Sequence, residues 1–431
     1  MFRQAIRNLP HLSEVYRNKV LNLVQKCSYS TGSLKDRVVS RYPGALNSYF
    51  TEKMVISGPG DSIPTYRVMN EDGDILDQGN EPQIPKEKLL KMYKDMLTLN
   101  TMDTILYDAQ RQGRISFYMT SYGEEAQIGS AAALTLQDVV FGQYREAGVL
   151  LHRGFTLQQF MNQVYTNCED LGKGRQMPIH YGSKQLNFQT ISSPLGTQLP
   201  QAAGAAYALK ASGLKACTIA YFGEGAASEG DFHAALNMSA TLSCPVIFFC
   251  RNNGFAISTP SHEQYRGDGI ASRGIGYGVD TIRIDGNDIL AVYNATKAAR
   301  AIAVDLGKPV LIEAMTYRVG HHSTSDDSSA YRSKQDVEDW KRLDNPITRF
   351  RKRLEKQGLW NQEQEDAFKA EIRKEILVAF KQAEEKKKPS ITNIFTDVFD
   401  TIPTHLQEQR DELLEHIKKH PDFYPIADHA Q

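Results

Sequence analysis

Three features are scarce in this sequence: excess charge, long apolar runs and closely spaced cysteines. Its 431 residues carry 50 Lys and Arg against 51 Asp and Glu, so no surplus of positive charge favours nucleic acid or a membrane surface as a partner. The apolar stretches are short and interrupted by charged residues, and none resembles a transmembrane span. The five cysteines include no Cys-x-x-Cys pair, which gives no indication of a zinc site or a disulfide framework and favours a reducing compartment. The chain is long enough for one large α/β domain with extensions.

The N-terminal segment differs from the rest in its charge. Residues 1–33 contain five Lys or Arg and a single acid, Glu14, and they end in a serine-rich stretch. This Arg-rich, acid-poor composition, without the apolar core of a secretory signal, predicts a mitochondrial transit peptide over residues 1–39 and a location in the mitochondrial matrix. An ordinary basic helix or a disordered arm is the alternative interpretation.

The rest of the chain divides into three parts by its patterning. Residues 40–84 are rich in Gly and Pro and are expected to form an N-terminal arm. Residues 85–345 begin with a predicted helix between Pro85 and Gly113 and form an α/β domain. Residues 346–431 are mostly charged helix and form a helical C-terminal region. Within the domain, helical stretches separate the β-branched runs "DVVFGQY", "ACTIAYF", "PVIFFC", "TIRIDG" and "PVLIEAMTY". This alternation predicts a mostly parallel sheet with helices on both faces.

The stretch between Gly223 and Gly254 carries the strongest chemical signal. Glu224 follows one predicted strand between two glycines, and Asn253 follows the next strand after one predicted helix. Both side chains should therefore reach the carboxyl edge of the sheet, where open α/β sheets bind ligands. A carboxylate and an amide oxygen suit Mg²⁺, which fills its other positions with phosphate oxygens and water. The capping-box spacing of Ser228 and Asp231 predicts a helix from Glu229, whose N-terminus favours a diphosphate.

Two other interpretations of this stretch deserve weight. A lone Gly-Glu-Gly occurs at many strand-end turns, and only its pairing with Asn-Asn-Gly one unit later makes it informative. A dinucleotide fingerprint would need Gly-x-Gly-x-x-Gly, but Gly223, Gly225 and Gly230 have the wrong spacing for the third glycine. Nicotinamide chemistry is therefore less favoured than a magnesium–diphosphate anchor.

Several motifs together extend this interpretation. They are "RISFYMTSYGEEA", "FGQYREAG", "LGKGRQMPIHYG", "ISSPLGTQLPQAAGAAYA", "CRNNGFAISTP" and "VGHHSTSDDSSAYRS". In combination they resemble the alpha subunits of the branched-chain 2-oxoacid dehydrogenases, a thiamine-diphosphate-dependent family, over nearly all of the chain after the presequence. The resemblance implies the thiamine-diphosphate-binding fold, in its diphosphate-binding half, with Mg²⁺ and K⁺ as further cofactors.

The resemblance also implies roles for individual residues. Glu224, Asn253 and the main-chain carbonyl of Phe255 would hold Mg²⁺; relatives commonly have tyrosine at the last position, which a backbone ligand tolerates. The residues implied to contact thiamine diphosphate are Tyr144, Arg145, Ser193, Leu195, Gly225, Ala226, Arg251 and His322. The residues implied to hold K⁺ are Ser192, Pro194, Thr197 and Gln198. Gly196 replaces an alanine that is frequent in relatives, which makes the K⁺ site the weaker expectation.

The resemblance assigns catalysis to His322 and makes the site incomplete on this chain. About 230 residues remain for the α/β part, room for one such domain, whereas the cofactor's aminopyrimidine needs a glutamate that a beta subunit would supply in an α2β2 assembly. A lipoyl-bearing transacylase core would accept the acyl group. Ser323 and Ser333, in the loop after His322, are implied phosphorylation sites for a regulatory kinase and phosphatase. The alternatives are a pyruvate-specific alpha subunit, a non-catalytic Rossmann-like binding subunit and a nicotinamide dehydrogenase.

Overall fold

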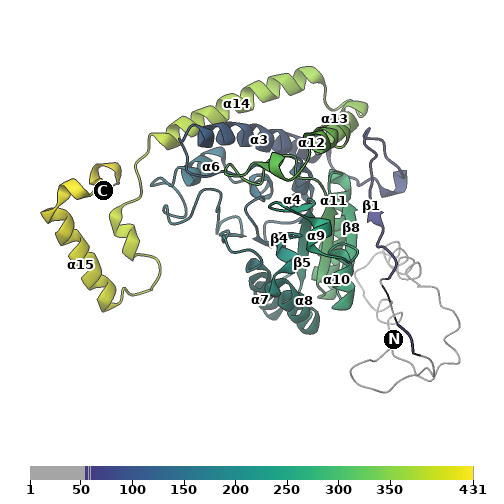
Figure 1. Ribbon diagram of the computed structural model, residues 1–431, viewed down its shortest axis with the longest axis horizontal. Helices are drawn as coiled ribbons and strands as arrows, with labels where there is room; N and C mark the ends of the chain where they lie inside the picture. Colours follow the sequence, from purple (N-terminus) through teal and green to yellow (C-terminus); the bar gives the residue numbers. More distant parts are fainter. Residues whose placement is uncertain (1–53, 57, 59, 431) are drawn as a thin grey trace. The chain divides into compact units, whose positions relative to one another are not determined.

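The computed structural model describes residues 54–56, 58 and 60–430. It divides at Gly60 into two compact units, and the unit from Asp61 to Gln431 contains the sheet (Figure 1). The predicted transit peptide, residues 1–39, lies outside the described residues. The strands of the main sheet are β1 (Thr65–Tyr66), β2 (Val139–Phe141), β3 (Phe188–Gln189), β4 (Thr218–Gly223), β5 (Val246–Asn252), β8 (Asp280–Asp285) and β9 (Val310–Met315).

The sheet is parallel, as the alternation of strands and helices predicts. Its seven strands follow the order β1-β8-β9-β5-β4-β2-β3 within the described residues, and each neighbouring pair runs parallel. A short antiparallel pair, β6 (Phe255–Ala256) and β7 (Thr259–Pro260), follows β5. The register pairs Gly223 with Arg251 at the ends of β4 and β5. The residues that follow these two strands therefore emerge side by side near the middle of the sheet.

Helices cover both faces of the sheet, and successive side chains of each strand enter different cores. On β4, Ile219 and Tyr221 join one core, while Ala220 and Phe222 join the other. The helices of the first core are α3 (Lys86–Arg111), α4 (Ile128–Ala133), α5 (Ala147–His152), α6 (Leu157–Val164), α11 (Ile289–Leu306), α13 (Pro346–Lys356) and α14 (Gln362–Glu384). The helices of the second core are α7 (Gln198–Ala211) and α8 (Gly230–Leu242), and α10 (Ala271–Gly276) packs against β8 and β9. Figure 1 shows α3 and α14 running along one side of the sheet and α7 and α8 on the other.

The remaining elements are short or C-terminal. The other α-helices are α9 (Ser261–Gln264), α12 (Lys334–Leu343) and α15 (Thr404–Lys419). The 3₁₀ helices are η2 (Gln78–Asn80), η3 (Glu125–Gln127), η4 (Ala226–Ser228), η5 (Ser328–Ala330), η6 (Ile391–Phe395), η7 (Pro421–Phe423) and η8 (Ile426–Asp428). The C-terminal region is helical, as the charged helical pattern of residues 346–431 predicts. Among the described residues no helix has both the length and the apolar character needed to cross a membrane.

Two local expectations need correction. The capping box predicted at Ser228 and Asp231 does not form: Ser228 ends η4, and α8 begins at Gly230 with Glu229 as an N-cap that makes no side-chain capping bond. The segment predicted as an aperiodic arm also contributes β1, which forms one edge of the sheet and pairs with β8. A two-residue strand has too few alternating positions to produce a detectable pattern.

Candidate functional site

The ends of β4 and β5 bring Glu224 and Asn253 together, as their spacing predicts. The backbone N–H of Asn253 donates to Glu224 Oε2 at 3.4 Å. Both side chains are buried, with exposed fractions of 1% for Glu224 and 5% for Asn253. The site therefore begins as a buried carboxylate and a buried amide on adjacent strand ends.

Glu224 has an unsatisfied oxygen. None of the described residues hydrogen-bonds its Oε1, although the atom is buried. Burial raises the pKa of this carboxyl to about 7, and the nearby negative charge of Glu124 adds to the effect. A buried carboxylate oxygen without a donor is costly unless a cation or a proton satisfies it. The residues present therefore fit a bound cation at Glu224.

The Asn253 side chain is held from both ends. Its Nδ2 donates to Glu124 Oε1 at 3.0 Å, and its Oδ1 accepts the backbone N–H of Phe255 at 3.2 Å. An amide oxygen has a second lone pair, so Oδ1 can accept one bond and still face a cation. This fixed orientation is compatible with the metal-ligand role that the resemblance implies.

A network of charges links these strand ends to Arg145 and Arg251. Arg251 on β5 donates to Glu146 Oε1 and to Glu124 Oε2, each at 2.6 Å. Arg145 lies 3.9 Å from Glu124 Oε1. Burial opposes ionisation of Glu124, but Arg251 and Arg145 outweigh it and hold its pKa below the usual value. The structure thus gives both arginines buried carboxylate partners, so a diphosphate would share these guanidinium groups with Glu124 and Glu146.

His322 lies against the same network. One terminal nitrogen of Arg145 donates to the His322 carbonyl at 2.8 Å and lies 3.3 Å from His322 Nδ1. Arg318 approaches the same Nδ1 at 3.5 Å, and the ring of Tyr144 packs edge-on, with centroids 5.9 Å apart. Burial and the two arginines lower the pKa of His322 to about 3. The imidazole is therefore neutral at physiological pH, and its Nδ1 faces two cations as an acceptor.

The loop after His322 is internally bonded. Arg332 donates to the carbonyls of Arg318, Val319 and Gly320. Asp326 accepts the backbone N–H of His322 at 2.8 Å and the hydroxyl of Tyr331 at 2.6 Å. The serine- and aspartate-rich composition of residues 323–333 thus supplies turns and caps within an ordered loop.

The two serines expected to be phosphorylated lie in different environments. Ser323 is buried, and its Oγ accepts the backbone N–H of Ser325 at 3.2 Å. Ser333 is exposed and caps α12, where its Oγ accepts the N–H of Asp336 at 3.0 Å. Ser333 is therefore accessible from solvent in this structure, whereas Ser323 is not.

The loop that precedes α7 carries the other expected ligands. Ser193 Oγ lies 2.7 Å from His180 Nε2, and Leu195 packs against the second core. Thr197 Oγ1 donates to the Pro194 carbonyl at 3.2 Å. Of the residues expected to hold K⁺, Ser192, Pro194 and Thr197 lie in this loop, and Gln198 begins α7. Gln198 ties the loop to the site because its side chain donates to the carbonyl of Tyr221 on β4 at 2.8 Å.

Close packing explains the glycine after Glu224. A Cβ atom built on Gly225 would lie 2.9 Å from the Cβ of Ala256, a distance that real contacts do not reach. Ala226 follows in η4 and is buried. The backbone of Gly225 and Ala226 therefore turns tightly next to Glu224. This backbone would lie close to any ligand bound at the Glu224 carboxylate.

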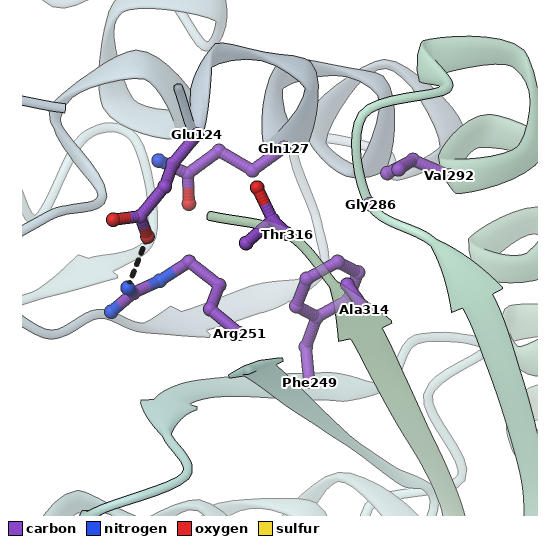
Figure 2. A pocket seen from close by; sticks show the side chains of 8 residues that line it. All are labelled: Glu124, Gln127, Phe249, Arg251, Gly286, Val292, Ala314 and Thr316. Carbon is purple, nitrogen blue, oxygen red and sulfur yellow. Dashed lines mark hydrogen bonds and ion pairs between the residues drawn. The ribbon is translucent and has the colours of Figure 1, made fainter. Parts of the chain in front are cut away.

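A small cavity lies beneath the charge network (Figure 2). Its lining includes Glu124, Gln127 and Arg251, and its volume of about 10 Å³ accommodates roughly one water molecule. Gln127 Oε1 is buried there without a hydrogen-bond partner among the described residues. This cavity is too small for a cofactor. The residues that line it support the charge network.

Sequence reasoning missed Glu124, Glu146 and His180, although the motifs that contain them were recognised. The sequence offers one signal: a buried arginine needs a carboxylate partner, and Glu146 is adjacent to Arg145 in "YREAG". For Arg251 no acid close in the sequence marks the partner, because Glu124 and Glu146 are 127 and 105 residues away. Among the described residues no group of three or more His, Cys, Asp or Glu has metal-binding geometry. A cation at Glu224 would therefore depend on amide and carbonyl oxygens as well.

The fold and the site define a class of protein. A parallel sheet covered on both faces, with a buried acid, an amide and two arginines at adjacent strand ends, is an α/β enzyme architecture that binds its ligand at the carboxyl edge. The model of the dehydrogenase E1 component family matches residues 93–392, and the chain belongs to this family. Membership implies thiamine diphosphate as the cofactor.

Curated relatives cover nearly the whole chain. The 2-oxoisovalerate dehydrogenase subunit alpha, mitochondrial, of Macaca fascicularis is 58% identical over 400 residues, which are 91% of this chain and 88% of the relative. The Homo sapiens protein of the same name is 57% identical over the same shares. The Dictyostelium discoideum protein of that name is 54% identical over 435 residues, 100% of this chain and 98% of the relative. The mitochondrial names of these relatives agree with the location predicted from the N-terminal composition.

Proposed function

We propose that this chain is the alpha subunit of a mitochondrial matrix 2-oxoacid dehydrogenase that acts on the 2-oxoacids derived from leucine, isoleucine and valine. It would take part in their oxidative decarboxylation and pass the acyl group to the lipoyl domain of a transacylase core. Relatives named for 2-oxoisovalerate support the branched-chain substrate over pyruvate. Membership of an enzyme family weighs against the non-catalytic binding subunit.

The observation that carries the proposal is the unsatisfied oxygen of Glu224 beside Asn253. Glu224, Asn253 and the main-chain carbonyl of Phe255 would hold Mg²⁺, an ion that suits hard oxygen donors. Arg145, Arg251 and the backbone of Gly225 and Ala226 would face the diphosphate. Thiamine diphosphate, when bound, supplies the electron sink for decarboxylation.

His322 would act in the neutral form. Its Nδ1 faces Arg145 and Arg318, so its single proton resides on Nε2. From that position the ring can donate a hydrogen bond to a group bound at the strand ends, and the edge-on ring of Tyr144 restricts its rotation. The two arginines discourage a second proton on the ring, which favours hydrogen-bond donation over proton transfer.

Two further parts of the proposal concern assembly. A beta subunit would supply the glutamate for the aminopyrimidine ring in an α2β2 heterotetramer, and the subunit-alpha names of the relatives support a partner chain. K⁺ would lie in the loop of Ser192, Pro194, Thr197 and Gln198, where it would stiffen the connection between Ser193 and α7. The tie from Gln198 to β4 gives that loop a direct route to the site.

The loop after His322 would serve as a regulatory switch. A kinase would phosphorylate Ser323 and Ser333, and a phosphatase would reverse the modification. A phosphate on Ser323 adds negative charge next to Asp326, whose N–H donates to the Ser323 carbonyl at 3.1 Å. Like-charge repulsion and the loss of the buried position of Ser323 would open the loop and hinder docking of the lipoyl domain. Normal lipoyl acylation by a Ser323→Glu variant would argue against this switch.

The test is co-expression with a beta subunit, followed by decarboxylation assays with branched-chain 2-oxoacids and with pyruvate. Activity should require thiamine diphosphate and Mg²⁺ and should favour the branched substrates, because each methylene is worth about 1–3 kcal/mol in a hydrophobic pocket. A preference for pyruvate would support the closest alternative. Reduction of a nicotinamide cofactor by the α and β chains alone would support the alternative of a nicotinamide dehydrogenase. It would contradict the proposal.

A further inference from the structure

His180 is buried beside the expected cofactor loop and uses both of its ring nitrogens. Its exposed fraction is 5%. Nδ1 lies 3.1 Å from the carbonyl oxygen of Pro178, and Nε2 lies 2.7 Å from Ser193 Oγ. A carbonyl oxygen only accepts hydrogen bonds, so Nδ1 carries the proton of the neutral ring. Nε2 is then an acceptor, and the hydroxyl hydrogen of Ser193 points at it.

The backbone around His180 is strained and held in place. Ile179 has φ 68°, a left-handed conformation that is unusual for a β-branched residue. Its N–H donates to Gln163 Oε1 at 2.9 Å, and Gln163 Nε2 donates to the Met177 carbonyl at 2.6 Å. Strained conformations of this kind persist where the surroundings over-determine them and gather at functional sites. The side chain of Gln163, on α6, thus fixes the turn that aims His180.

The pairing with Ser193 follows from a short hairpin. The N–H of Ile191 donates to the Tyr181 carbonyl at 3.0 Å, and a bridge joins Ser183 to Phe188. This register places His180 opposite the segment that leaves Ile191. Ser193 itself is exposed, so a buried histidine controls the hydroxyl of an exposed serine.

We infer that His180 is a positioning residue that turns Ser193 Oγ into a pure hydrogen-bond acceptor toward the bound cofactor. With its hydrogen committed to His180, the serine oxygen offers only lone pairs to the site. Thiamine diphosphate carries one N–H donor group, the exocyclic amine of its aminopyrimidine, and that amine would be the partner that suits this oxygen. The inference rests on the proposed function, because it assumes that Ser193 contacts this cofactor.

Two substitutions of His180 separate the role of each nitrogen. His180→Gln places an amide oxygen near the position of Nε2 and keeps an acceptor for Ser193. His180→Asn, one methylene shorter, can still bond the Pro178 carbonyl but does not reach Ser193. Tyr181→Phe is the matched control, because it removes a buried hydroxyl without a partner among the described residues from the same hairpin.

The measurement is the affinity of the assembled αβ complex for thiamine diphosphate at saturating Mg²⁺, together with the near-ultraviolet circular dichroism of the bound aminopyrimidine. We expect His180→Asn and Ser193→Ala each to weaken binding roughly three- to tenfold, the effect of one hydrogen bond, and to alter the dichroism in the same way. The double variant should be no weaker than either single variant. His180→Gln and Tyr181→Phe should bind like the wild type.

Other results overturn the inference. Equal affinity of His180→Asn and wild type, while Ser193→Ala binds weakly, would show that Ser193 acts without His180. Additive losses in the double variant would give His180 a role independent of Ser193, and an unchanged Ser193→Ala would remove the contact altogether. A wild-type complex that binds no thiamine diphosphate would overturn the proposed function and the inference together. The wild-type binding measurement alone reveals that outcome, before any variant is compared.

Discussion

Among the buried charge clusters of the described residues, two differ in how fully their groups are hydrogen-bonded. The strand-end cluster contains Glu124, Glu146, Glu224, Arg145 and Arg251. The α13 cluster, between the arm, β8 and α13, contains Arg67, Asp285, Asp288, Asp344 and Arg349. Both place several charged side chains out of water, where unpaired charge is costly.

The α13 cluster leaves its central groups fully bonded. Arg349 donates to Asp285 at 2.9 Å, to Asp344 at 3.2 Å and to the carbonyls of Asn70 and Met69. Asp288 accepts four backbone N–H groups, from Val68, Met69, Leu290 and Ala291. The strand-end cluster, in contrast, contains the unsatisfied Oε1 of Glu224 and its raised pKa. Complete bonding marks a cluster that holds the fold together, and a missing donor marks one built to receive a ligand.

The largest effect is expected in the satisfied cluster. Arg349→Met leaves Asp285, Asp288 and Asp344 without their shared cation, and loss of one partner from a buried pair costs about 3–5 kcal/mol of unfolding free energy. Denaturant unfolding of the assembled complex measures this loss. Cofactor affinity of the fraction that folds should be unchanged. Lys352→Met, which removes an exposed pair with Asp72, is the control and should leave the unfolding curve in place. A weakened cofactor affinity in Arg349→Met would break the distinction between the clusters.

The strand-end cluster should respond in the opposite way. Glu224→Gln keeps the size of the side chain but removes a proposed metal ligand. Outer partners of metal sites already cost 10–100-fold in affinity, so Mg²⁺-dependent binding of thiamine diphosphate should fall roughly a hundredfold or more, about 2.7 kcal/mol. Thermal unfolding without Mg²⁺ should change little, because Oε1 has no hydrogen bond to lose. A large drop in melting temperature with normal cofactor binding would assign Glu224 to structure.

The His322→Asn variant tests the surroundings of the strand-end cluster through the pH dependence of the unfolding free energy. The pKa of His322 is lowered to about 3 in the folded chain, by burial and the two arginines, against about 6.5 when unfolded. Between these values the unfolded state binds more protons, so the contribution of His322 to stability is present above pH 6.5 and is lost as pH falls. Wild-type unfolding free energy should therefore fall more steeply than that of His322→Asn, by up to about 1.4 kcal/mol from pH 6.5 to 5.5. Parallel curves from denaturant titrations at several pH values would mean that the pKa of His322 is the same in the folded and the unfolded chain.

The smallest effect is expected at the end of the loop. Ser333→Ala removes the cap of α12, worth about 1 kcal/mol, and should increase hydrogen exchange in the first turn of that helix. Neither cluster touches Ser333, so cofactor affinity should stay constant. Ser333→Asp retains a capping oxygen and is expected to restore protection. Unchanged exchange in Ser333→Ala would show that contacts other than the cap hold the helix start.

Sequence patterns predicted the alternating strands and helices of this fold. Five strands of the main sheet and their parallel direction followed from alternation, whereas the two-residue strands β1 and β3 did not. The meeting of Glu224 with Asn253 followed from one strand–helix–strand spacing. The strand-end acids were harder, because Glu124 belongs to a segment far from Arg251 in the chain and only tertiary packing joins them. The His180–Ser193 pair depends on a backbone conformation at Ile179 that no propensity favours. Periodicity therefore locates the edge of the sheet, while the bonding of each site side chain depends on long-range packing.

The position of β1 determines how much of the N-terminal part of the chain can be removed while β8 stays covered. Thr65 and Tyr66 occupy one border of the seven-stranded sheet, where they pair with Arg283 and Ile284 of β8. Proteolytic trimming upstream of Thr65 leaves that border closed, whereas a cut beyond Tyr66 would bare the amide and carbonyl row of β8 and invite association with other chains. The position of two residues thus sets a limit on how far the chain can be shortened from its N-terminal side without exposing a strand edge.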